Sequence, residues 1–93
     1  MYDIENYVGK TITIKFNNGI EAIASCIGFN AEDEIITVKE PRVVVINDKE
    51  LALIPYMLTG DLSQVFLPLR TIQCIATPHV QSDKDYTKII KDK

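Results

Sequence analysis

The sequence predicts a mainly β protein, a small and strongly bent five-stranded antiparallel barrel with a short N-terminal helix. Thr11–Phe16 alternates apolar and polar residues with period two, and Asn17-Asn18-Gly19 then supplies a hairpin turn. The return segment Ile20–Phe29 would span about 33 Å as a strand. That length cannot lie flat on a small core, so the sheet must curve and close. Ninety-three residues with 46% hydrophobic content and no Trp support one core of Ile, Val and Leu.

The elements before residue 40 follow from local patterns. Residues 3–8 are predicted to form a short helix with Asp3 as its cap and Gly9 at its exit. Two turns of helix are unstable alone in water, so this helix should lie over an open end of the barrel. The Asn-Gly step favours a two-residue turn with positive φ at both central positions. A further strand is expected at 34–38.

The chain after residue 40 contains four prolines and several short apolar runs. Pro41 interrupts a strand at an edge or a bulge, after which 42–46 continues that strand or begins another. A single 3₁₀-like turn at Pro68–Arg70 should separate the last two strands. The remaining expected elements are a turn at Asn47-Asp48, an apolar strand at 51–57, a turn at 59–61 and strands at 64–67 and 71–76.

The chain changes character near residue 78. We expect residues 1–78 to form the barrel domain with its N-terminal helix and residues 79–93 to form a polar C-terminal tail. Ser82 and Asp85 have the spacing of a capping box, and Tyr86 belongs to a helically spaced apolar set. Four lysines and little apolar surface favour a frayed tail instead. Helix and disorder both remain open for this segment.

Composition and charge exclude several classes of function. The net charge is −3, whereas a protein that holds DNA by general electrostatics is normally basic. We therefore expect no strong nonspecific DNA binding, and any nucleic-acid site must be local. No apolar run approaches the roughly 20 residues that cross a bilayer, so no membrane partner is expected. Cys26 and Cys74 lie far apart in apolar strand patterns, as expected for free thiols in the reducing cytoplasm.

Motifs for catalysis or metal binding are missing from the sequence. There is no Gly-rich phosphate loop and no paired His or Cys ligand spacing. His79 stands alone beside Pro78, and a single His does not make a metal site. We therefore expect no metal, no cofactor and no enzymatic activity.

Apolar strands at 51–57 and 65–67 are a hazard in so small a chain, because an unpaired apolar edge aggregates unless something pairs with it. Another copy of the same chain is the simplest partner. Head-to-tail pairing of edges closes into a ring, and about five to seven subunits would suit such a barrel. The residues expected at this subunit interface are Val65, Phe66, Leu67, Ile72 and Cys74.

The order of these elements resembles the Sm-like family of Sm, Lsm and bacterial Hfq-type proteins over roughly residues 4–77. The first motif consists of alternating Ile12, Ile14 and Phe16, then Asn18-Gly19, then Ile27-Gly28-Phe29-Asn30, where the family commonly has a Gly-Phe-Asp-like step. The second motif is Val65-Phe66-Leu67 with Ile72. The resemblance implies small barrels that assemble into rings and mostly bind RNA.

Two loops carry RNA contacts in that family, and both depart from its pattern here. Glu32 falls where the family has a stacking aromatic or His, and Glu34 falls where it has an Asn. Pro68-Leu69 replaces the Arg-Gly or Lys-His of the second loop, with Arg70 and Thr71 one step later. The candidate RNA-binding residues are Asn30, Glu32, Glu34, Arg70 and Thr71.

Two functions remain open from the sequence. One is a ring subunit that binds single-stranded RNA through an atypical nucleotide pocket in RNA metabolism. The alternative is a ring-shaped scaffold or protein-interaction module that binds no RNA, which the acidic loop and net charge of −3 favour. The acidic loop is either a solvated turn or a site for a cation or basic partner. Arg70 contacts either phosphate or an acid of a neighbouring subunit.

Overall fold

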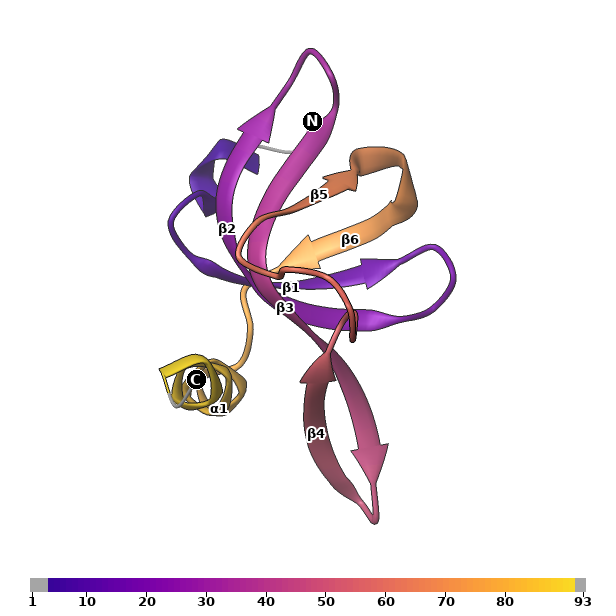
Figure 1. Cartoon of the computed structure of the whole chain (residues 1–93), viewed down its shortest axis with the longest axis vertical. Coiled ribbons are helices and arrows are strands. Elements are labelled where there is room, and N and C mark those ends of the chain that lie inside the picture. Colours follow the sequence, from indigo (N-terminus) through magenta and orange to yellow (C-terminus); the bar gives the residue numbers. More distant parts are fainter. Residues whose placement is uncertain (1–3, 92–93) are drawn as a thin grey trace.

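The computed structural model describes residues 4–91 as a strongly bent antiparallel sheet with one C-terminal helix (Figure 1). Sheet order is β4-β3-β2-β1-β6, and β5 also pairs with β3. The predicted fold class is therefore confirmed. In chain order the elements are η1 (Ile4–Tyr7), β1 (Thr11–Phe16), β2 (Glu21–Asn30), β3 (Ile35–Asn47), β4 (Glu50–Pro55), β5 (Val65–Pro68), η2 (Leu69–Thr71), β6 (Ile72–Ala76) and α1 (Val80–Lys91).

The β1–β2 hairpin has a three-residue loop instead of the two-residue turn expected from its Asn-Gly step. Phe16 N donates to Ile20 O over 2.8 Å, and Gly19 N donates to Phe16 O over 2.9 Å. Only Gly19 has positive φ in this loop, at 90°. A turn of ordinary hand followed by a left-handed glycine matches the strand twist as well as a two-residue turn does. Gly19 is therefore the residue that makes the turn possible.

Two bulges bend β2 and β3, so the curvature does not depend on a glycine in the middle of β2. In the β2–β3 ladder, Ile27 is an extra residue on β2, and Glu40 and Pro41 lie opposite Ala24 alone. Glu40 takes φ of 50°, as a bulge residue can. Pro41 lies in this bulge, one of the two positions expected for it. The segment at 42–46 continues β3 without a break.

Both β4 and β5 pair with β3, so the strands expected at 51–57 and 64–67 are both present, as Glu50–Pro55 and Val65–Pro68. β4 pairs with the second half of β3 and β5 with its first half. Residues 56–64 leave the sheet between them. The β3–β4 hairpin extends away from the rest of the sheet (Figure 1). Its turn residues, Asp48 and Lys49, have φ of 50° and 71°, as in a two-residue hairpin turn.

The core fills the inside of the bend, where the inward faces of β1, β2 and β3 meet. Its fully buried members include Ile12, Ile14, Ala24, Ile36 and Val38. Ile4 of η1 covers one end of this core at 3% exposure. The expected N-terminal helix is wrong in kind, because η1 is a single 3₁₀ turn.

Two further expectations for the N-terminal turn have different outcomes. Gly9 does end the segment with φ of 87°. Asp3, the expected cap, lies outside the described residues.

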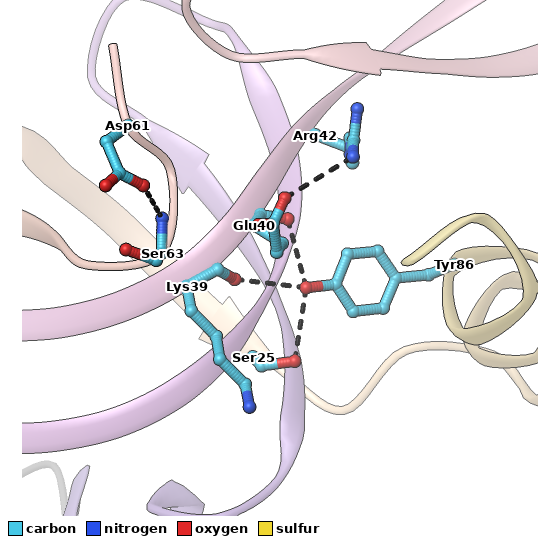
Figure 2. Close-up of polar contacts among 7 residues, drawn as sticks. All are labelled: Ser25, Lys39, Glu40, Arg42, Asp61, Ser63 and Tyr86. Carbon is cyan, nitrogen blue, oxygen red and sulfur yellow. Dashed lines mark hydrogen bonds and ion pairs between the residues drawn. The ribbon is translucent and has the colours of Figure 1, made fainter. Parts of the chain in front are cut away.

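The C-terminal segment forms α1, which Tyr86 anchors to the sheet (Figure 2). The Tyr86 side chain is fully buried, and its hydroxyl lies 3.1 Å from Lys39 O, 3.0 Å from Glu40 O and 3.1 Å from Ser25 Oγ. Of the two expectations for this tail, the helix is confirmed over residues 80–91. The capping box at Ser82 is wrong, because the helix already begins at Val80.

Candidate nucleic-acid interface

Two loops far apart in sequence meet at one end of the bent sheet. The first, residues 30–34, joins β2 to β3, and the second is η2 between β5 and β6. Leu69 N donates to Glu34 O over 2.8 Å, which joins the two loops directly. Antiparallel pairing of β5 with the start of β3 causes this, since Ile35 lies opposite Pro68. The structure therefore brings the candidate residues of both loops to the same end of the molecule.

The first loop is closed by Asn30 and Asp33. Asn30 Oδ1 accepts from Asp33 N over 3.0 Å, and Asn30 Nδ2 donates to Asp33 Oδ2 over 3.1 Å. The side-chain amide of Asn30 is thus used to hold the turn. Glu32, Asp33 and Glu34 are all exposed, and Glu34 takes φ of 54°. Three adjacent carboxylates without an aromatic side chain repel phosphate and offer no ring for base stacking.

The second loop is fixed by Asn17 of the β1–β2 loop, a residue whose spacing in the sequence gave no sign of this role. Asn17 Nδ2 donates to Arg70 O over 2.7 Å, and Asn17 N donates to Thr71 O over 2.9 Å. The Thr71 hydroxyl donates to Pro68 O over 2.7 Å. Arg70 is exposed, and its guanidinium forms no ion pair with any of residues 4–91. The loop therefore presents one unpaired cation from a rigid backbone.

The candidate interface residues divide into two groups. Leu67 belongs to the core at 8% exposure, and Val65 and Ile72 pack against that core. Phe66 is 60% exposed and Cys74 is also exposed. Within residues 4–91, β5 pairs only with β3 and β6 only with β1, so each strand has an unpaired outer edge. Val65, Leu67 and Ile72 therefore pack the edge strands against the core. Phe66 and Cys74 are exposed on the surface of the single chain.

A cavity of about 720 Å³ lies between α1 and the sheet. Its apolar lining includes Ile23, Leu53 and Ile89, while its charged lining mixes Asp85 with Lys88. Charges of both signs do not favour an anionic ligand. This cavity is the space left beside a helix that reaches the sheet mainly through Tyr86.

Other kinds of site find little support among residues 4–91. No three His, Cys, Asp or Glu side chains gather there as a metal-binding group. Burial raises the pKa of the Cys26 thiol, which opposes formation of a reactive thiolate. Over the same residues, no helix is both long and apolar enough to cross a membrane.

The bent sheet, its strand order and the three-residue turn before the last strand define an Sm-like fold. A heptameric archaeal Sm protein superposes with a TM-score of 0.57 at 9% identity, covering 82% of this chain and 96% of that one. The Pyrococcus abyssii Sm protein in complex with a uridine heptamer gives a TM-score of 0.57 at 15% identity, with 81% and 92% covered. At these identities the similarity is one of fold.

A third solved structure matches more of the chain. A chain of the NatC complex bound to CoA gives a TM-score of 0.55 at 11% identity, covering 97% of this chain and 96% of that one. No protein-family model matches the sequence, and no curated protein is similar to it.

Proposed function

We propose that this chain is the subunit of a homo-oligomeric Sm-like ring that binds single-stranded RNA in RNA metabolism. The observation that carries the proposal is the junction of residues 30–34 with η2 through the Glu34–Leu69 hydrogen bond. Arg70 and Thr71 follow directly on this junction. A protein with the same fold is in complex with a uridine heptamer, which supports the same class of ligand here.

The nucleotide pocket in this proposal is atypical. Glu32 and Glu34 repel phosphate, whereas Arg70 supplies a cation from the adjoining loop. Asn30 and Thr71 already use side-chain groups within their own loops. RNA would therefore approach from the η2 side, where the charge is favourable, and repulsion from the acids would be strongest at low salt, where it is least screened.

Titration with uridine-rich and adenine-rich oligonucleotides tests this proposal directly. Fluorescence anisotropy at low salt should show saturable binding of at least one of the two RNAs. The affinity should fall as salt rises, with a slope of about 0.7 per phosphate contact in a plot of log affinity against log salt. An absence of binding to both RNAs at low salt would remove the RNA-binding function.

A protein-interaction scaffold without RNA binding is the second candidate. The similarity to a chain of the NatC complex, which extends over 97% of this chain, supports it. The exposed acids of residues 30–34 suit a basic partner surface. A pull-down with chemical crosslinking should then recover a defined protein partner. Recovery of nucleic acid alone would count against the scaffold.

Both candidates describe a binding module rather than an enzyme. The buried Cys26 has a raised pKa, and Ser25 hydrogen-bonds to the Tyr86 hydroxyl instead of to a base. Neither side chain is activated as a nucleophile. We place the protein in the cytoplasm, where free thiols such as Cys26 and Cys74 persist.

A further inference from the structure

A second cavity, about 530 Å³, opens between the β1–β2 loop, η2 and the first residue after β4. Buried Phe16 and Leu67 line its apolar part. Asn17 and Thr71 contribute polar lining; the Asn17 amide donates to Arg70 O of η2, and the Thr71 hydroxyl donates to Pro68 O at the end of β5. The volume lies within the roughly 300–1,000 Å³ that small ligands occupy in proteins. It is large enough for one nucleotide.

Tyr56 supplies an aromatic ring to this cavity. Its ring centroid lies 5.7 Å from that of Phe16, with the two planes tilted by 57°. Its backbone N donates to Pro41 O over 3.1 Å, so the residue is fixed at the bulge of β3 as well. The ring is half-buried and lines the cavity. A ring held in this way loses little conformational freedom when a base stacks on it.

Among residues 4–91, Arg70 is the one charged residue that lines this cavity. No carboxylate of this described part of the chain lines it, although the whole sequence carries a net charge of −3. The guanidinium is exposed and without an ion-pair partner among residues 4–91, so it is available to an anion. Asn17 holds the carbonyl of Arg70, which fixes the point from which the side chain extends.

We propose that this cavity binds one nucleotide of single-stranded RNA, with the base against Tyr56 and a phosphate on Arg70. The inference rests on the proposed RNA-binding function and names the place where the base is held. It moves the stacking contact from the acidic loop at 30–34 to the segment at 56–64. That segment interrupts the pairing of β3, and Tyr56 is its first residue.

Tyrosine fluorescence and RNA affinity together test the site. The chain has no Trp and four Tyr, so stacking on Tyr56 should quench a measurable part of the emission. Tyr56→Leu keeps an apolar side chain against Phe16 and removes the flat ring. Arg70→Gln removes the charge and leaves the backbone contacts of η2 in place. Each substitution should weaken RNA binding about tenfold, since one base stack or charged contact contributes on that order.

Lys39→Ala is the matched control, because Lys39 is an exposed cation that does not line the cavity. Its RNA affinity should stay within about twofold of wild type, a smaller change than the loss of one stacking contact would cause. RNA-induced quenching should persist in Lys39→Ala and be lost in Tyr56→Leu. Circular dichroism establishes whether each variant is folded. If Tyr56→Leu does not fold, the RNA affinity of Arg70→Gln tests the site.

The possible outcomes distinguish failure of this nucleotide site from failure of the proposed RNA-binding function. If wild type binds RNA and both cavity variants bind as tightly as Lys39→Ala, the cavity is not the base site and the RNA-binding function stands. If wild type binds neither RNA at low salt, both proposals are overturned. Loss of affinity in Tyr56→Leu and Arg70→Gln, with quenching confined to proteins that retain Tyr56, supports both.

Discussion

The Tyr86 side chain extends from α1 to the sheet. Its hydroxyl lies at the bulge of β3, beside the carbonyl oxygens of Lys39 and Glu40 (Figure 2). The bulge is the reason these carbonyls are available, because an extra residue in one strand disrupts the ladder locally. Ser25 Oγ completes the cluster at 3.1 Å. The phenol thus pairs polar groups that the bend of the sheet would otherwise leave buried and unsatisfied.

Replacement of Tyr86 by Phe should lower the free energy of unfolding by about 1–3 kcal/mol, because the buried polar groups lose their shared partner. Urea denaturation followed by circular dichroism measures the loss. Tyr7→Phe is the matched control, since the Tyr7 hydroxyl has no hydrogen-bond partner within residues 4–91. Equal stability of the two variants would contradict this account of the anchor.

Tyr86 should also make the stability of the folded protein decrease at alkaline pH. Burial, the largest cause, raises the pKa of Tyr86 above its usual value, while the hydrogen bond from Ser25 acts in the opposite direction. The folded protein therefore keeps this proton at a pH where the unfolded chain releases it. The contribution is complete below the ordinary tyrosine pKa of about 10 and is lost as pH rises above it. Urea midpoints measured between neutral pH and the alkaline range should fall more steeply for wild type than for Tyr86→Phe.

The sequence allowed part of this residue-level detail to be predicted. Helical spacing placed Tyr86 on the apolar side of a helix. Its partners could not be predicted, because they are backbone carbonyls exposed by a bulge about 46 positions earlier in the chain. Arg70 shows the same limit. Its side chain was identified as a candidate, but its support from Asn17 depends on the pairing of β1 with β6.

Two hairpin turns illustrate what local sequence determines at the scale of an element. Asn17-Asn18-Gly19 predicted a turn correctly, but not its length. Asn tolerates several turn conformations, so the choice falls to the surroundings. Here Asn17 N donates to Thr71 O, which favours a three-residue loop. The separate strands at 51–57 and 64–67 were predicted, but the end of the first at Pro55 was not, because the apolar run at 51–57 carries no sign of where its pairing ends.

The β3–β4 turn offers a test of backbone strain. Lys49 adopts φ of 71° although its side chain is exposed and makes no demand for that conformation. The left-handed region costs a non-glycine residue roughly 1–2 kcal/mol, whereas glycine loses about 0.5–1 kcal/mol through its greater freedom when unfolded. Lys49→Gly should therefore raise the free energy of unfolding by about 0.5–1 kcal/mol.

The control for this substitution is Lys39→Gly, at an exposed strand residue whose φ is negative. Glycine relieves no strain there and should destabilise by about 0.5–1 kcal/mol. Thermal and urea unfolding of both variants measure the difference. A loss of stability in Lys49→Gly as large as that in Lys39→Gly would show that the turn carries no strain of this kind.

At the scale of the whole molecule, the sheet leaves edges that its own strands do not cover. β5 and β6 are joined by the three residues of η2, yet within residues 4–91 neither pairs with the other. An unpaired strand edge beside an exposed aromatic such as Phe66 is a template on which another strand can pair. The apolar character of 65–67 made this edge predictable from the sequence. Subunit number was not predictable, because it depends on the angle between neighbouring copies.

Assembly through this edge predicts different outcomes for two substitutions of the same chemical type. Phe66→Glu places a charge on the outer side of β5, where the wild-type side chain is 60% exposed in the single chain. Burying that carboxylate between subunits would cost several kcal/mol, so the ring should dissociate while each protomer stays folded. Leu58→Glu alters a residue that is 91% exposed and lies outside β5 and β6, so it should leave the assembly intact. Analytical ultracentrifugation of wild type and both variants over a wide concentration range measures the native mass. Wild-type protein that sediments as a folded single chain at every concentration would show that these edges pair with something other than a second copy.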